Sequence, residues 1–253
     1  MQTHQEISAY WSTRAENHNN YVNQELPTQR TQAWLEQILA QVPNTRPLRV
    51  LDAGCGPGFF SILLSRAGHT VTGVDGSAEM LRHARRNAAE QGVEPEFLQM
   101  DCCHLDFPDD TFDLILSRNL THILTDHRQA YGEWRRALKP GGVLLIFDAN
   151  WHLPYVEGPI RQEALWREAE CFRLYGSNFS GGDCPYEYIG SDLHPECYEA
   201  LGDLRRPDFD VGVLLGLGYR EVSFDRDVTE KLWSEKEKLM YHATPLFQIR
   251  AVK

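Results

Sequence analysis

The chain of 253 residues has no long hydrophobic run and no surplus of basic residues. A membrane-spanning helix needs about 18 consecutive apolar residues, whereas apolar runs here, such as V-L-L-I-F at 143–147, have the length of a strand. Lys and Arg number 25 against 36 Asp and Glu, which gives a formal net charge of -11. Because a surface that neutralises phosphates needs clustered cations, we expect neither nucleic acid nor a membrane as a partner.

A secretion signal and paired cysteines are also missing. The first residues, M-Q-T-H-Q-E, lack the basic and then apolar start of a signal peptide. The six cysteines include no C-x-x-C pair, which argues against a disulfide framework and a structural zinc site. We therefore predict a cytoplasmic protein with reduced thiols and no metal. One alternative stays open: Cys171, Cys184 and Cys197 could serve a metalloid or thiol acceptor.

From residue 47 onward the sequence alternates short apolar runs with helical patterns. One helix is expected to open at Ser77 and another to run from about Asp126 to Leu138. Strands that alternate with helices at this spacing form right-handed crossovers and a parallel sheet. The predicted fold class is therefore α/β, doubly wound. The strand-like runs are L-R-V-L-D-A, H-T-V-T-G-V-D, E-F-L-Q-M-D, F-D-L-I-L-S-R-N and G-V-L-L-I-F-D-A-N.

Two regions interrupt this alternation. Residues 1–46 are polar and include an amphipathic pattern, T-Q-A-W-L-E-Q-I-L-A-Q-V, which predicts a helix. Residues 151–206 are rich in aromatics, glycine and proline and are too long for a simple loop. We predict that they form a cap inserted over the carboxyl ends of the strands. Residues 47–150 and 207–253 then make up the main domain, and the latter segment is predicted as a helix, a turn and two strands.

The strongest motif is V-L-D-A-G-C-G-P-G-F at 50–59. A strand delivers Asp52 to its carboxyl end, and the glycines after it allow a tight turn in which backbone N–H groups face a ligand. A second acid, Asp75, ends the next strand about 20 residues later, a spacing at which a carboxylate can accept from ribose hydroxyls. Simple turn glycines and a helix-capping acid are the alternatives. The pattern predicts a nucleoside-binding crevice.

The spacing G-x-G-x-G differs from the dinucleotide fingerprint G-x-G-x-x-G, since position 59 is Phe. With Asp52 two residues before the first glycine, the segment resembles motif I of the class I S-adenosylmethionine-dependent methyltransferases. The resemblance implies a Rossmann-like, mostly parallel seven-stranded sheet with an antiparallel last strand, and S-adenosyl-L-methionine as cofactor. Further segments that carry it are V-D-G-S-A-E-M-L at 74–81, Q-M-D-C at 99–102, F-D-L-I-L-S-R-N at 112–119 and L-K-P-G-G-V-L-L-I at 138–146.

The same resemblance implies roles for individual residues. Asp52 would hold the methionine moiety, Asp75 the ribose and Asp101 the adenine amino group, with Met80 beside the ring. Carboxylates suit a diol and an amine because both are hydrogen-bond donors. A surface position for Asp101 and a packing role for the cysteines are alternatives. The predicted cofactor residues are Tyr21, Asp52, Gly54, Cys55, Gly56, Gly58, Phe59, Asp75, Gly76, Met80, Asp101, Cys102, Ser117, Arg118 and Asn119.

The acceptor side is predicted from the segment after the fourth strand. N-L-T-H-I-L-T-D at 119–126 resembles the N-x-L-H-H-L-x-D segment of ubiquinone-biosynthesis-like methyltransferases, with Ile123 in place of the second histidine. We predict that His122 is the catalytic residue, as a base or a substrate ligand; the alternative is a half-buried packing histidine. The strand ends in S-R-N-L and not in N-P-P-Y, which argues against nucleobase N-methylation. The segment Y-W-S-T-R-A at 10–15 resembles the lid helix of such enzymes, which implies that residues 1–46 form an N-terminal helical lid. The predicted substrate contacts are Tyr10, Trp11, Arg14, His152, Tyr155, Trp166, Tyr186 and Tyr188.

Together these features predict methyl transfer to a small-molecule acceptor by in-line displacement, with S-adenosylhomocysteine as the product. A methyltransferase-like binding module without catalysis and an NAD-type oxidoreductase are the competing interpretations. The acceptor atom (O, N, S or C) and the oligomeric state do not follow from the sequence, because this scaffold serves many acceptors.

Overall fold

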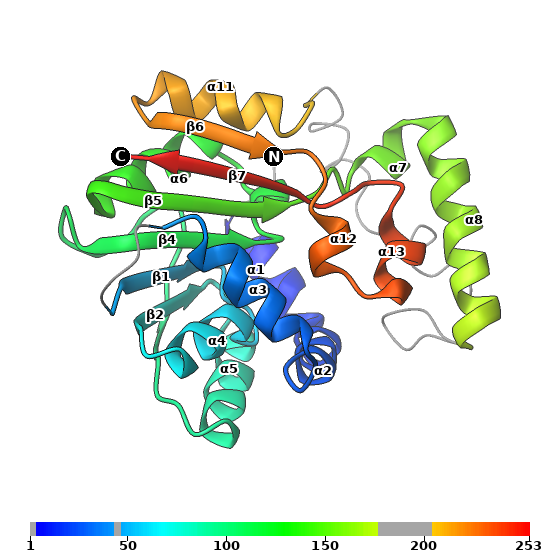
Figure 1. Cartoon of the computed structure of the whole chain (residues 1–253), viewed down its shortest axis with the longest axis horizontal. Coiled ribbons are helices and arrows are strands. Elements are labelled where there is room, and N and C mark those ends of the chain that lie inside the picture. Colours follow the sequence, from blue (N-terminus) through cyan, green and yellow to red (C-terminus); the bar gives the residue numbers. More distant parts are fainter. Residues whose placement is uncertain (1–3, 43–46, 177–203) are drawn as a thin grey trace.

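The computed structural model of the protein describes residues 4–42, 47–176 and 204–253. Its centre is one seven-stranded sheet in the order β3-β2-β1-β4-β5-β7-β6 (Figure 1). Strands β1 to β5 pair in parallel, and β7 runs antiparallel to both of its neighbours. The predicted α/β fold with an antiparallel last strand is confirmed. The strands are β1 (Arg49–Ala53), β2 (Thr70–Asp75), β3 (Glu96–Gln99), β4 (Phe112–Arg118), β5 (Leu138–Asp148), β6 (Arg220–Asp225) and β7 (Phe247–Val252).

Helices pack on both faces of this sheet. Along β1, Val50 and Leu51 are both fully buried, but they point into two different hydrophobic cores. This is expected, since strands of a covered parallel sheet are apolar on both faces. The helices are α1 (His4–Thr13), α2 (Ala15–Glu25), α3 (Arg30–Leu39), α4 (Phe59–Arg66), α5 (Ala78–Glu90), α6 (His127–Ala137), α7 (Leu153–Val156), α8 (Gly158–Tyr175), α11 (Asp208–Gly216), α12 (Thr229–Leu232) and α13 (Glu235–Tyr241), with a 3-10 turn, η1 (Thr121–Ile123).

The two cores follow from the alternation of side chains along the strands. Helices α3, α4 and α5 contribute to the core on one face, where Trp34 packs against Phe60 and Phe147 with ring centroids 5.1 Å apart in each case. Helices α6 and α11 contribute to the other, where Trp134 is fully buried. The amphipathic pattern in the N-terminal segment is thus α3, a helix that belongs to the sheet's own core.

The segment between β6 and β7 differs from the expectation. A helix, a turn and two strands were predicted after residue 207, and the structure adds α12 and α13 between those strands. Ser234 caps α13 through a reciprocal capping box, in which its hydroxyl accepts from the Glu237 N–H and its own N–H donates to the Glu237 carboxylate at 2.6 Å. The signature S-x-x-E is visible in the sequence as S-E-K-E. The capping box is the physical reason for the helix, and it is a signal that sequence reasoning missed.

The added helices lie where they can shape a site. Figure 1 shows α2, α7, α8, α12 and α13 beyond the carboxyl ends of β4 and β5, and α13 packs against α8. Ligands of open α/β sheets bind at the carboxyl edge, where the strand order reverses. Here that reversal falls between β1 and β4.

Every helix in the described part of the chain is too short or too polar to cross a bilayer. The division into lid, main domain and cap remains a prediction. Cys171 is buried on α8, whereas Cys184 and Cys197 lie outside the described residues. The alternative role of these three cysteines therefore also remains a prediction.

Candidate active site

The glycine-rich loop between β1 and α4 forms the floor of the site. Gly54, Gly56 and Gly58 have φ angles of +68°, +50° and +92°, in the left-handed region that favours glycine. A Cβ atom on Gly54 would also stand 2.7 Å from a Leu120 methyl carbon, closer than side chains pack. The motif therefore needs glycine both for its turn and for its close approach to the segment after β4.

Asp75, at the end of β2, orders this loop. Its carboxylate accepts from the Gly56 N–H at 2.9 Å and from the Ser77 N–H at 2.8 Å. It thereby joins the glycine loop to the start of α5, which Ser77 caps as predicted by accepting from the Met80 N–H at 3.2 Å. Since a carboxylate offers about four acceptor positions, this side chain is suited both to order the loop and to accept from a ligand diol.

Asp52, at the end of β1, is 2% exposed. It accepts two hydrogen bonds from Ser61, from the backbone N–H at 2.9 Å and from the hydroxyl at 2.6 Å. Burial raises the pKa of Asp52 to about 7, in spite of the hydrogen bonds from Ser61 that favour its ionised form. A cationic ligand group beside this carboxyl would favour the ionised form, so the position is suited to an ammonium or sulfonium.

The third acid follows β3. Asp101 accepts from the Cys103 N–H at 2.8 Å and pairs with Nδ1 of His104 at 3.0 Å.

The thiols of Cys55 and Cys102 are buried, and burial raises the pKa of each well above its ordinary value. Because a thiolate and not a thiol is the nucleophile, these cysteines are packing residues of the site.

One cavity of about 410 Å³ connects these groups, within the usual size range of small-molecule sites. All the predicted cofactor residues line it except Gly58, which precedes α4, and Ser117, which is fully buried in β4. Among the predicted substrate residues, Tyr10, Trp11, Arg14 and Tyr155 line it.

The remaining predicted substrate residues lie elsewhere. His152 is buried behind the site, and Trp166 is 60% exposed on α8; within the described residues neither lines the cavity. Tyr186 and Tyr188 lie outside the described residues.

Sequence reasoning missed an aromatic cluster on the cavity wall. Trp151, Trp233 and Tyr241 all line it, with ring centroids 6.2 Å apart for the two tryptophans and 5.5 Å apart for Trp151 and Tyr241. Glu237 and Met240 of α13 line it as well. The residues of α12 and α13 were missed because no element was predicted between the last two strands, and Trp151 was placed in the predicted cap without a role.

Arg118, at the end of β4, is held by the N-terminal helices. Its guanidinium donates to Glu25 at 2.9 Å and to the Tyr21 hydroxyl at 3.0 Å, and it lies 4.5 Å from the centre of the Trp34 ring. Tyr21 in turn donates to Glu237 of α13. Arg118 and Tyr21 line the cavity, and they also hold α2 against β4 and α13.

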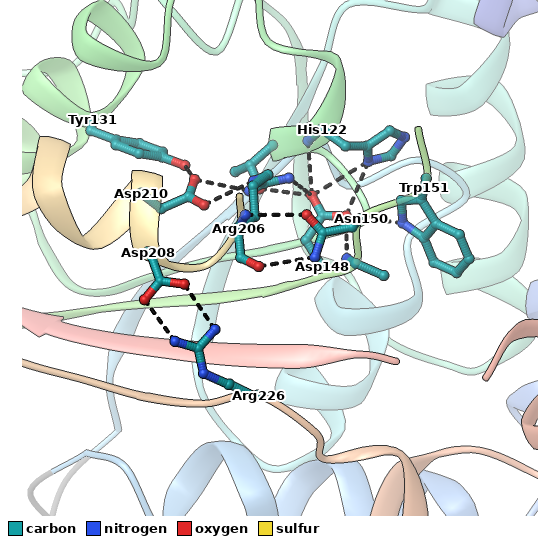
Figure 2. Close-up of polar contacts among 11 residues, drawn as sticks. His122, Tyr131, Asp148, Asn150, Trp151, Arg206, Asp208, Asp210 and Arg226 are labelled. Atoms are coloured by element: carbon teal, nitrogen blue, oxygen red, sulfur yellow. Dashed lines mark hydrogen bonds and ion pairs between the residues drawn. The ribbon is translucent and has the colours of Figure 1, made fainter. Parts of the chain in front are cut away.

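His122 lies on η1, opposite the glycine loop, and is 7% exposed at the cavity wall. Its Nδ1 is 3.1 Å from Asp148, the last residue of β5 (Figure 2). Burial acts to raise the pKa of Asp148, but the charge of Arg206 and the hydrogen bonds from His122 and Thr121 outweigh burial and hold that pKa well below its usual range. The predicted catalytic histidine is therefore paired with a buried, ionised carboxylate that sequence reasoning missed.

Comparison with known proteins gives a consistent assignment. A family described as a methyltransferase domain matches residues 51–146. The chain is similar to demethylmenaquinone methyltransferase from Lactiplantibacillus plantarum, with 30% identity over 68% of this chain and 73% of the relative. It is also similar to phosphatidylethanolamine N-methyltransferase from Cereibacter sphaeroides, with 38% identity over 46% of this chain and 57% of the relative. The chain spans about half the length of several curated relatives that it matches.

Solved structures share the fold. A putative S-adenosyl-L-methionine-dependent methyltransferase from Methanococcus maripaludis superposes with a TM-score of 0.60 at 20% identity. The superposition covers 96% of this chain and 93% of the other. At this identity the likeness shows the fold alone.

Proposed function

Since the chain belongs to the class I S-adenosylmethionine-dependent methyltransferases, we propose that it transfers the methyl group of S-adenosylmethionine to a small-molecule acceptor inside the cavity. One observation carries the proposal: a single cavity is lined by the glycine loop, the acids that follow β1, β2 and β3, and His122. Cofactor groups and an acid–base group thus face the same enclosed space.

The residues present fit S-adenosylmethionine. Asp75 and Asp101 are acceptors suited to the ribose hydroxyls and the adenine amino group, which are donors. Met80, 3% exposed, provides apolar packing next to them. Asp52 is suited to the cationic methionine end, because a positive charge favours its ionised form. When bound, S-adenosylmethionine supplies an electrophilic methyl carbon on a cationic sulfonium.

The acceptor half of the cavity has the composition of a small-molecule site, with flat apolar rings and few polar groups. Trp151, Trp233 and Tyr241 would exclude water and orient the acceptor, while His122 would accept its proton or hydrogen-bond to it. Alignment of acceptor and donor is the main requirement of such a displacement. Two relatives are named as methyltransferases of demethylmenaquinone and of phosphatidylethanolamine. These names support a small molecule or a lipid as the acceptor.

Calorimetry tests the cofactor assignment. We expect S-adenosylmethionine and S-adenosylhomocysteine to bind with one site each and NAD not to bind. Binding of NAD alone would overturn the proposal in favour of an oxidoreductase. Binding of both sulfur compounds without S-adenosylhomocysteine formation across a broad acceptor panel would favour a binding module.

Turnover of a variant tests the role of His122. General acid–base catalysis contributes about 10²–10⁴-fold, so His122→Ala should lower kcat by at least about a hundredfold at saturating acceptor. His242→Ala is the matched control, because His242 is 39% exposed in its side chain and pairs with Asp227 at 3.3 Å, away from the cavity lining. An unchanged kcat in His122→Ala would remove the catalytic role and leave a packing histidine.

A further inference from the structure

The surroundings of Asp148 fix the state of the histidine beside it. Both carboxylate oxygens accept hydrogen bonds in a fully buried position. The partners are the His122 N–H at 2.9 Å, the Ala149 N–H at 2.8 Å, the Thr121 hydroxyl at 2.7 Å, the Trp151 indole N–H at 3.0 Å and the Arg206 guanidinium at 3.3 Å. An ionised carboxylate only accepts, so the group facing it at 3.1 Å, Nδ1 of His122, must donate.

This requirement determines which nitrogen of His122 faces the cavity without a proton. In a neutral imidazole one nitrogen donates and the other accepts. With the proton on Nδ1, the lone pair is on Nε2, which Figure 2 shows pointing away from Asp148. No residue in the described part of the chain hydrogen-bonds to Nε2, and the ring lines the cavity. The base position therefore faces the space proposed for the acceptor.

A second carboxylate and an arginine are buried together with Asp148. Arg206 is 1% exposed in its side chain and bridges two buried carboxylates, Asp148 at 3.3 Å and Asp210 at 2.8 Å. Tyr131 donates to Asp210 as well (Figure 2). The buried group of two carboxylates, Arg206 and a neutral His122 has one net negative charge. Transfer of an acceptor proton to Nε2 would leave every charge of this buried group paired, as buried charges require.

We infer that Asp148 is a positioning residue that holds His122 with its proton on Nδ1, so that Nε2 takes a proton from a hydroxyl group of the acceptor. The inference rests on the proposed methyl transfer, and it identifies the acceptor as a hydroxyl compound. The acceptor O–H bond breaks, its proton bonds to Nε2, and the electron pair remains on oxygen as the nucleophile. A neutral amine or a thiolate already has a free lone pair and needs no strong base. A planar phenol or enol also suits the rings of Trp151 and Trp233 on the cavity wall.

Nitrogen NMR tests the positioning role without any turnover. Protein labelled with ¹⁵N-histidine is saturated with S-adenosylhomocysteine and measured at about pH 9, where an ordinary imidazole is neutral. The His122 signals are identified by their loss in His122→Gln. We expect the Nδ1–H form in the wild type. In Asp148→Asn, where an amide replaces the carboxylate, we expect the Nε2–H form to become populated.

The matched control is Asp210→Asn. This carboxylate is as deeply buried as Asp148 and also binds Arg206, but it makes no contact with His122. We expect the His122 signals of Asp210→Asn to keep the Nδ1–H pattern. An Nε2–H form in the wild type would overturn the inference even if the Asp148 variant failed to fold. An unchanged Nδ1–H form in a folded Asp148→Asn would overturn it as well.

A chromogenic phenol tests the acceptor class. We use 4-nitrophenol, whose ionised form absorbs visible light, with the protein saturated in S-adenosylhomocysteine. Near its own midpoint of ionisation we expect bound nitrophenol to show more phenolate absorbance in the wild type than in His122→Gln. Absence of binding, or binding as neutral phenol, would overturn the hydroxyl assignment. If S-adenosylhomocysteine itself does not bind, the proposed function fails; if it binds and these tests fail, only the present inference does.

Discussion

The two halves of the cavity are built in different ways. The cofactor half, meaning the glycine loop with Asp75 and Asp101, is held by contacts of modest sequence separation; Asp75 accepts from Gly56, 19 residues away. The acceptor half, meaning α2, η1, residues 151–155, α12 and α13, is held by distant partners; Tyr21 donates to Glu237 across 216 residues. The first half depends on backbone geometry, and the second depends on buried side-chain pairs that the tertiary fold must bring together.

The energetic consequences differ accordingly. In the cofactor half, carboxylates accept from backbone N–H groups, and loss of one partner leaves the fold of the sheet intact. The acceptor half is joined to β4 by an ion pair between Glu25 of α2 and Arg118 of β4, in which the carboxylate side chain is fully buried. Loss of one partner of such a pair leaves an uncompensated buried charge. We therefore expect variants of the acceptor half to lose stability and variants of the cofactor half to lose affinity.

The largest effect should come from Arg118→Met. When the Arg118 guanidinium is removed, the Glu25 carboxylate keeps two partners, the Trp34 indole N–H and Arg30 at 3.6 Å. Breaking a buried pair costs about 3–5 kcal/mol, so we expect the free energy of unfolding to fall by about 3 kcal/mol or more. Urea denaturation followed by tryptophan fluorescence measures it. A loss below about 1 kcal/mol would mean that the buried pair does not hold the acceptor half together.

Two controls separate burial from charge in this experiment. Arg173→Ala breaks a pair with Glu170 on α8, where the arginine side chain is 65% exposed, and should leave the unfolding free energy nearly unchanged because exposed ion pairs contribute little. The double variant Arg118→Met with Glu25→Gln removes both charges. It should be more stable than Arg118→Met alone, because no unpaired carboxylate remains.

The next effect concerns affinity in the cofactor half. In Asp75→Asn one carboxylate oxygen becomes an NH₂ group, so the hydrogen bond from either Gly56 or Ser77 is lost, and that atom can no longer accept from a ribose hydroxyl. Losing about two such hydrogen bonds costs about 1.5–3 kcal/mol, so the Kd for S-adenosylhomocysteine should rise about 10–100-fold in calorimetry. Asp109→Asn, at a side chain 72% exposed, should bind as the wild type does. Equal affinity of the two variants would contradict the role of Asp75.

The same difference between local and distant contacts explains which features could be predicted from the sequence. Gly54 and Asp75 were predictable because a left-handed φ and a strand-terminal acid leave their mark within one short motif. The sheet was predictable because its strands are continuous apolar runs. The partnership of His122 with Asp148 was not, since nothing local links residues 26 positions apart. Glu237 was missed for a different reason: its capping-box signature is present in the sequence but was not used in the prediction.

The pH dependence of the unfolding free energy should reveal the burial of Asp52 in the cofactor half. Burial raises the pKa of Asp52 from 3.8 to about 7. A carboxyl whose pKa is raised in the fold contributes stability that is fully present below about pH 4 and is lost as pH rises through about 7. The wild type should therefore lose stability relative to Asp52→Asn across this interval, by at most about 1.4 kcal/mol per pH unit. Thermal unfolding at several pH values measures the difference, and a difference that stays constant with pH would contradict the assignment.

Cofactor binding should show the opposite trend at the same residue. A cationic group next to Asp52 favours its ionised form, so the affinity for S-adenosylmethionine should rise with pH up to about 7 and binding should release protons. Calorimetry in buffers of different ionisation enthalpy counts those protons. Asp52→Asn should abolish the release, and proton uptake in the wild type would show that no cation lies beside this carboxyl.

The smallest effect should come from the capping box of α13. Ser234→Ala removes the hydroxyl that accepts from the Glu237 N–H at 3.2 Å and that also contacts the Glu237 carboxylate at 2.6 Å. Loss of an N-cap costs about 1 kcal/mol, and the thermal midpoint should fall by a few degrees. Because α13 carries Glu237, Met240 and Tyr241 to the acceptor wall, the acceptor affinity should weaken while the Kd for S-adenosylhomocysteine stays unchanged. If both affinities fell together, the two halves would be one cooperative unit, and the distinction between a locally encoded cofactor half and a tertiary acceptor half would be wrong.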